Sequence, residues 1–164
     1  MFCAERFPSG GAAQRPISIN LDKICHFLVI GASRSGKSVT SMLITAKAAL
    51  HIKNSKIWIL DFKGDSETFG FLTNVVADCR YWQYTDCVQG LEDYYTAFQE
   101  RLSHDPGPGL NLLWADEWAS LILNLPKKEA ETAKLMLSTV LMMGRSKRCQ
   151  VLTSVQRASA ELFF

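Results

Sequence analysis

Residues 31–38 carry the side chains most able to do chemistry in this sequence. They read Gly-Ala-Ser-Arg-Ser-Gly-Lys-Ser and fit the pattern G-x-x-x-x-G-K-[ST]. Glycines at its two ends let the backbone curl until successive N–H groups point at phosphate oxygens. Lys37 can then reach the β- and γ-phosphates of a nucleotide, and the Ser38 hydroxyl can ligate Mg²⁺. A glycine-rich turn could match by chance, but a strand-like run before it and a helical pattern after it favour a phosphate-binding loop.

An acidic pair completes the expected nucleotide site. The apolar run 110–115 ends directly before Asp116 and Glu117. In open α/β sheets, ligands bind at the carboxyl ends of the strands, where this pair would lie. Asp116 is expected to hold the Mg²⁺ shell, and Glu117 to orient and deprotonate a water molecule. An acid aimed at water indicates hydrolysis rather than phosphate transfer to a small molecule.

ATP and Mg²⁺ are therefore the expected cofactors. Mg²⁺ is expected on Ser38 and Asp116. The residues expected to surround the nucleotide phosphates are those of the loop and the first helical residues, namely Gly31, Ala32, Ser33, Arg34, Ser35, Gly36, Lys37, Ser38 and Val39.

Strand-like and helix-like segments alternate along the chain and would position these residues. Helical spacing of apolar residues occurs in 37–51, 91–102 and 127–144. Apolar runs of strand length lie at 24–31, 56–60, 76–83, 110–115 and 149–155. This alternation predicts an α/β fold with a mostly parallel central sheet, covered by helices on both faces.

Composition limits the number of domains. The 164 residues, 48% hydrophobic and 21% charged, suffice for one sizeable core. Residues 1–16 are rich in Gly, Pro and Ala and are expected to form a flexible tail before a core spanning 17–164.

We expect a cytoplasmic protein without a membrane segment, because no signal-peptide pattern or long apolar run is evident. The five cysteines lack a C-x-x-C pair, so neither a disulfide framework nor a zinc site is expected.

Positive charge is concentrated towards the C-terminus. Residues 127–164 contain seven Lys or Arg and three Glu, although the net charge of the whole chain is only +2. A solvated helix face and an anion-facing surface both explain this distribution. Trp82, Trp114 and Trp118 are expected to pack in the core rather than to stack on nucleic-acid bases.

Five segments, in order, resemble the FtsK/SpoIIIE-like DNA-translocating ATPases of the FtsK–HerA group. The likeness runs from about residue 26 to residue 157. Its first two segments, "HFLVIGASRSGKSVT" and "KIWILDFKGD", resemble the strand–loop–helix of that family and its strand ending in Asp-x-Lys. The others, "LEDYY", "LLWADEWASLI" and "GRSKRCQVLTSVQRAS", are similar to its acidic-aromatic helix, its metal-and-base strand and its segment ending in Gln-Arg.

The resemblance implies a RecA-like P-loop NTPase fold with three α/β/α layers. It further implies an ATPase that moves DNA without regard to sequence, as a hexameric ring when active; the isolated chain is expected to be mainly monomeric. Gln156 would lie between the catalytic carboxylates at the end of the strand and sense the γ-phosphate. The alternative is a polar residue that simply ends a strand. Arg145 or Arg148 would be an arginine finger, or else part of a solvated helix end. Asp61 and Lys63 match the Asp-x-Lys motif, or form an ordinary turn after a strand.

Two departures from the family and several alternatives remain open. Ala158 stands where the family commonly has Pro, and the family continues with a further strand and helix beyond the position of Phe164, which leaves a truncated C-terminal end open. A conjugative coupling or viral DNA-packaging ATPase of the same group is the nearest alternative. A small-molecule P-loop kinase and a nucleotide-gated assembly protein that does not cycle are the alternatives from other classes.

Overall fold

A five-stranded parallel sheet in the order β3-β7-β6-β4-β5 forms the centre of the computed structural model. The structure describes residues 2–4, 16–17, 20, 24–157 and 159–163. The strands of the sheet are β3 (Phe27–Ile30), β4 (Lys56–Asp61), β5 (Cys79–Gln83), β6 (Asn111–Asp116) and β7 (Cys149–Val155). The parallel sheet expected from the sequence is confirmed.

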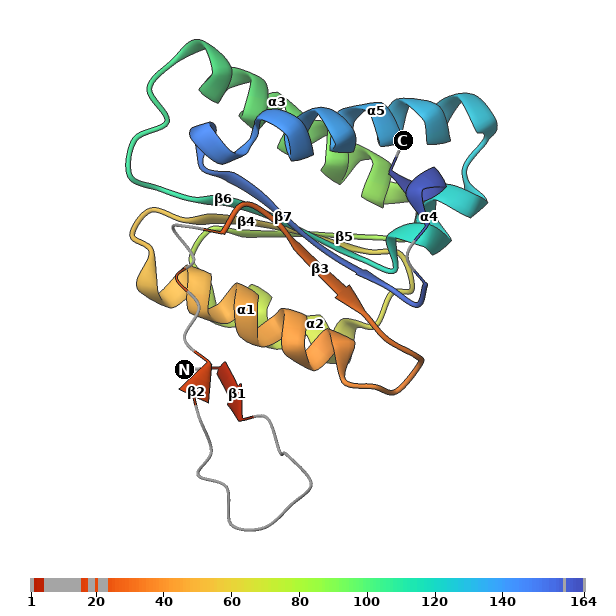
Figure 1. The fold of residues 1–164 in the computed structure, drawn as a ribbon, viewed down its shortest axis with the longest axis horizontal. Helices are drawn as coiled ribbons and strands as arrows, with labels where there is room; N and C mark the ends of the chain where they lie inside the picture. The colour runs from red at the N-terminus through yellow and green to blue at the C-terminus, as the bar shows by residue number, and fades with distance from the viewer. Residues whose placement is uncertain (1, 5–15, 18–19, 21–23, 158, 164) are drawn as a thin grey trace.

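Helices cover both faces of the sheet, as Figure 1 shows. On one face lie α1 (Lys37–His51) and α2 (Ser66–Val75); on the other lie α3 (Cys87–Ser103), α4 (Trp118–Asn124) and α5 (Lys127–Met143). Three short 3₁₀ turns connect elements or follow them, namely η1 (Tyr84–Asp86), η2 (Arg145–Lys147) and η3 (Ala160–Leu162). The predicted three-layer α/β/α arrangement is therefore confirmed.

Two apolar layers, one on each face of the sheet, hold these elements together. Strands β4 and β6 read as continuous apolar runs because both of their faces are covered. Trp58 and Tyr94 pack edge to face on the α3 side, with ring centroids 5.3 Å apart, and Phe69 packs against Trp114 on the α2 side at 4.7 Å. This packing fixes where each strand ends, and therefore where its last side chains point.

The predicted core role of the tryptophans is also confirmed. Trp114 and Trp118 are fully buried, and Trp82 is partly buried against the same core as Trp118. The indole nitrogen of Trp118 donates to the Leu162 carbonyl oxygen at 2.6 Å. These rings are therefore not available to stack on nucleic-acid bases.

Three parts of the fold differ from the sequence-based expectation. Helices α2 and α4 were not predicted. In the N-terminal region, β1 (Phe2–Ala4) pairs with β2 (Pro16–Ile17) in an antiparallel ladder that the composition of residues 1–16 did not indicate. Residues 5–15 lie outside the described residues. So does Ala158, the position at which the family commonly has Pro.

None of the helices in the described ranges is both long and apolar enough to span a membrane. Cys25, Cys79, Cys87 and Cys149 are free thiols, and Cys3 lies where side chains are not described. Burial, with nearby carboxylates, raises the pKa of Cys87 to about 12. Such a thiol stays protonated and unreactive at neutral pH.

Candidate nucleotide site

The glycine-rich loop joins the end of β3 to the start of α1. Gly36 is the N-cap of α1 and has φ of 85°, a left-handed conformation that favours glycine. A Cβ on Gly31 would lie 2.5 Å from the Ser35 hydroxyl oxygen, so a larger residue there would displace the Ser35 side chain. The conformation of the loop therefore favours glycine at Gly36, and close packing within the loop favours it at Gly31.

Lys37 is the first residue of α1 and is largely buried. Its Nζ donates to the Ala32 carbonyl oxygen at 3.0 Å, across the loop. Residues 32–36 of the loop are exposed, whereas the Ser38 side chain is partly buried. A hydrogen bond to one neutral carbonyl is weaker than a charge-assisted bond to phosphate, so the ammonium can exchange this partner for a nucleotide.

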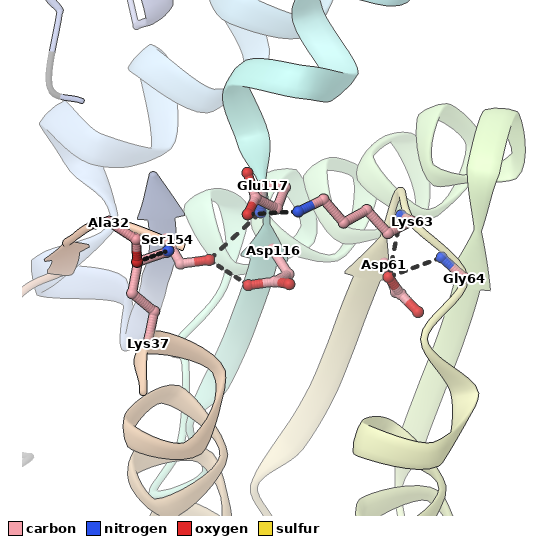
Figure 2. Close-up of polar contacts among 8 residues, drawn as sticks. All are labelled: Ala32, Lys37, Asp61, Lys63, Gly64, Asp116, Glu117 and Ser154. Atoms are coloured by element: carbon pink, nitrogen blue, oxygen red, sulfur yellow. Dashed lines mark hydrogen bonds and ion pairs between the residues drawn. The ribbon is translucent and has the colours of Figure 1, made fainter. Parts of the chain in front are cut away.

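Asp116 and Glu117 lie at the carboxyl end of β6, as predicted. Asp116 ends the strand, and Glu117 caps α4 in a left-handed conformation with φ of 51°. Both side chains are buried. Ser154 on β7 joins the pair, because its hydroxyl donates to Asp116 Oδ1 and accepts from the Glu117 N–H at 3.3 Å (Figure 2). A left-handed backbone at a non-glycine residue is strained and is found most often at functional sites.

The environment of Asp116 favours a bound cation. Burial raises the pKa of this carboxyl, the hydrogen bond from Ser154 lowers it, and the charges of Glu117 and Asp61 raise it further. A positive charge would relieve both the burial and the repulsion.

The donor set fits Mg²⁺ that arrives with a nucleotide. Mg²⁺ takes oxygen ligands and is usually held by one or two side chains together with water and substrate phosphates. Ser38 and Asp116 can supply the two protein oxygens. Within the described residues, no three His, Cys, Asp or Glu side chains are arranged to hold a metal ion by themselves.

The Asp-x-Lys motif, whose role the sequence left open, reaches the acidic pair. Asp61 ends β4 and is fully buried, and its carboxylate accepts hydrogen bonds from Lys63 N, Gly64 N and the Tyr81 hydroxyl at 3.1, 3.0 and 2.6 Å. Lys63 Nζ lies 2.8 Å from Glu117 Oε1 (Figure 2). Sequence reasoning named neither Ser154 nor Tyr81; a polar residue near the end of an otherwise apolar strand was the available signal.

Gln156 follows β7 directly and is exposed. β7 lies between β3 and β6, and the N–H of Gly31 donates to the Val155 carbonyl oxygen at 3.3 Å. Gln156 therefore follows the strand that separates the loop from the acidic pair, at the sheet edge where the resemblance puts it. Its role as a γ-phosphate sensor stays a prediction.

The structure does not bring Arg145 and Arg148 into this site. Arg145 begins η2 and Arg148 follows it, so both precede β7 and lie at the opposite edge of the sheet. The seven residues of β7 span about 20 Å. Arg34 lies in the loop and is exposed, with φ of 64°. An arginine finger from Arg145 or Arg148 could therefore serve only the site of another subunit.

Comparisons with known proteins bear on the fold. No protein-family model matches the chain, and no curated protein matches it. Among solved structures, the cytoplasmic domain of the type VII secretion ATPase EccC from Thermomonospora curvata matches with a TM-score of 0.68 and 15% identity, covering 87% of this chain and 17% of that one. This chain has the fold of an ATPase domain.

Two further solved structures give the same result. ATPases 2 and 3 of EccC from T. curvata, in complex with a signal sequence peptide, match with a TM-score of 0.62 and 15% identity over 87% of this chain and 27% of that one. ATPases 2 and 3 of EssC from Geobacillus thermodenitrificans match with a TM-score of 0.63 and 16% identity over 86% of this chain and 30% of that one. The chain thus spans less than a third of each of these proteins.

Proposed function

We propose that this chain is the ATP-hydrolysing core of a motor that moves a polymer. The observation that carries the proposal is the sheet order β3-β7-β6, which brings three strand ends to one edge. These ends carry the glycine-rich loop with Lys37, the residue Gln156, and the pair Asp116 and Glu117. A phosphate cradle beside a buried base is the arrangement that ATP hydrolysis requires.

Each residue has a distinct part in this reaction. The loop N–H groups and Lys37 would bind the phosphates, and Ser38 and Asp116 would hold Mg²⁺, which would supply further positive charge when bound. Glu117 accepts a proton from the attacking water. Ser154 orients Asp116 and the backbone of Glu117, so that metal ligand and base keep a fixed relation. Gln156 would contact the γ-phosphate and report its loss to β7.

DNA, bound without regard to sequence, is the cargo that the resemblance to the FtsK/SpoIIIE-like translocases supports. The excess of basic residues in 127–164 is consistent with phosphate contacts. In the structure these residues do not form one patch, because Lys127 and Lys128 begin α5 whereas Arg145 and Arg148 lie beyond its far end. The 17 residues of α5 span about 25 Å. Contacts with DNA would therefore be divided between two places on one subunit.

A polypeptide is the second candidate cargo. It is favoured by one observation, that the matching EccC is named as a type VII secretion ATPase and one EccC structure is in complex with a signal sequence peptide. The catalytic residues would keep the same parts with either cargo, because hydrolysis depends on the nucleotide site alone.

The rate of ATP hydrolysis in the presence of each polymer tests this function. We expect a low rate for the chain alone and a several-fold increase with double-stranded or single-stranded DNA, lost at high salt because phosphate contacts release counterions. Stimulation by an unfolded polypeptide and not by DNA would favour the secretion motor. Transfer of phosphate from ATP to a small acceptor, without release to water, would contradict both.

A further inference from the structure

The contact between Lys63 and Glu117 joins two segments that lie far apart in the chain. Lys63 Nζ lies 2.8 Å from Glu117 Oε1, and the two residues are 54 positions apart. The side chain of Glu117 is 9% exposed, whereas that of Lys63 is 52% exposed. In the described part of the chain, Lys63 is the one ion-pair partner of this carboxylate.

The turn that carries Lys63 is stabilised by a partly buried hydrogen-bond network around Asp61. The Asp61 carboxylate accepts the N–H groups of both Lys63 and Gly64. The Tyr81 hydroxyl donates to the same carboxylate and accepts from Gln83 Nε2 at 2.7 Å. Asp61 therefore fixes the backbone of Lys63 although the lysine side chain itself is half exposed.

Gly64, the residue after Lys63, packs tightly against the Tyr84 ring. Its φ is 73°, and a Cβ at this position would overlap the ring of Tyr84. A larger residue would be strained at this φ and would displace either the turn or the Tyr84 side chain. The lysine is thus delivered to Glu117 by a defined turn rather than by a loose loop.

We propose that Lys63 is a positioning residue for the base Glu117. Its ammonium occupies Oε1 and fixes the orientation of the carboxylate, so that the other oxygen is left to accept the proton of the attacking water. This inference rests on the proposed ATP hydrolysis. It assigns a role to each charged residue of the Asp-x-Lys motif. Asp61 fixes the backbone of the turn, and Lys63 fixes the orientation of the Glu117 carboxylate.

A general base must be held within hydrogen-bond reach of the water that it deprotonates. Glu117 is the N-cap residue of α4, and its backbone N–H donates to the Ser154 hydroxyl. That hydrogen bond does not fix the torsions of the Glu117 side chain. The ion pair with Lys63 supplies that constraint. A pair with one half-exposed member contributes little to stability, so its loss should affect the reaction more than the fold.

Steady-state kinetics of Lys63→Met test the proposal, with Lys53→Met as a matched control on an exposed lysine at the other edge of the sheet. We expect kcat to fall on the order of tenfold to a hundredfold with KM for ATP changed less than about threefold, because the base is misplaced while the phosphate cradle is intact. Lys63→Arg, which keeps the charge and the donors, should recover most of the lost rate. Lys53→Met should behave as the wild type.

A second measurement compares the rates of ATP hydrolysis of the wild type, Lys63→Met, Glu117→Gln and the double variant. We expect the losses of rate to be non-additive, because the side chains touch and Lys63 acts through Glu117. The double variant should hydrolyse ATP no more slowly than Glu117→Gln alone. A further loss of rate in the double variant would overturn the proposal.

The outcomes separate this inference from the function on which it rests. If the wild type hydrolyses ATP, Glu117→Gln does not, and Lys63→Met matches or exceeds the wild type, then the positioning role is wrong while the proposed function stands. If the wild type hydrolyses no ATP with any polymer, the proposed function itself fails. If Glu117→Gln hydrolyses ATP as the wild type does, the assignment of Glu117 as the base is wrong and the inference falls with it. Loss of ATP binding in Lys63→Met would also overturn the inference, because a positioning residue for the base should leave affinity unchanged.

Discussion

At the scale of single residues, the charged form of Asp116 is unfavourable in the folded chain without a ligand. Burial and the neighbouring carboxylates raise the pKa of this group in the folded chain. A raised pKa means that the folded state binds the proton more tightly than the unfolded state, so the stabilisation is present at low pH and is lost as pH rises through the folded value. At neutral pH, the charged carboxylate of Asp116 therefore destabilises the folded state relative to the unfolded state.

Asp116→Asn should accordingly stabilise the nucleotide-free chain and abolish its response to MgATP. The amide removes the buried charge and can still accept from Ser154. We expect the unfolding midpoint without nucleotide to rise by about 2–4 °C if the gain is about 1 kcal/mol, and the further rise on adding MgATP to disappear. Differential scanning calorimetry of the wild type and of the control Asp86→Asn, an exposed residue, measures both. A lower midpoint together with a normal MgATP response would contradict the assignment.

At the scale of elements, close contact between helix and sheet is what sets the strand ends in register. Gly90 on α3 shows how close this contact is. A Cβ on Gly90 would lie 2.6 Å from atoms of both Leu60 and Trp82. Glycine is poor for helix formation, so packing rather than propensity explains its presence here.

Gly90→Ala and Gly70→Ala should therefore change stability in opposite directions. Gly70 lies in α2 with nothing within 4 Å of its added Cβ, so alanine there should stabilise the chain by about 0.5–1 kcal/mol. Gly90→Ala should destabilise it by about 1–3 kcal/mol, because Leu60 or Trp82 must move. Urea unfolding of the two variants measures this. Stabilisation by both would show that propensity outweighs packing, and destabilisation by both would contradict the open space found around Gly70.

The sequence predicts those elements whose pattern is local. Helix α1 and strand β7 have the predicted bounds, and α5 ends at the predicted Gly144, because apolar spacing, glycine and β-branched residues mark them. Helix α2 was missed because Gly70 lies inside it and its ten residues are few for a clear period, and α4 because seven residues are too few to show a period.

The candidate site was predictable where a motif places the residue and not where folding does. The loop and the pair Asp116 and Glu117 follow directly from spacing. The contact between Lys63 and Glu117, and the contact of Ser154 with Asp116, depend on which strands become neighbours. The order β3-β7-β6-β4 is set by packing across the whole chain, so no local pattern contains it.

At the scale of the whole molecule, the two ends of the sheet have different parts. One edge holds the proposed nucleotide site, and the other holds Arg145 and Arg148 about 20 Å away. A head-to-tail assembly would bring the second edge of one subunit towards the first edge of the next. A finger supplied in this way is worth several orders of magnitude in rate, so the isolated chain should be a poor ATPase.

Specific activity should therefore rise with protein concentration or on adding DNA that templates a ring. Arg145→Ala or Arg148→Ala should reduce that rise in specific activity at least tenfold. ATP affinity should stay unchanged, because neither residue lies at the nucleotide site of its own subunit. Lys53→Ala, a loss of positive charge at the same edge of the sheet, is the control and should keep the gain. Full activity in a dilute monomer, unchanged in both arginine variants, would show that the site is complete in one chain.

The most direct test of the account compares MgATP binding and phosphate release for the wild type, Lys37→Ala and Glu117→Gln. Lys37→Ala should lose binding and turnover together, because the loop loses its cation against the β- and γ-phosphates. Glu117→Gln should bind MgATP with near wild-type affinity by calorimetry and release phosphate at least a hundredfold more slowly, since only the base is gone. If the Gln variant fails to bind while the Ala variant binds normally, or if Glu117→Gln hydrolyses ATP at the wild-type rate, the proposed site is wrong.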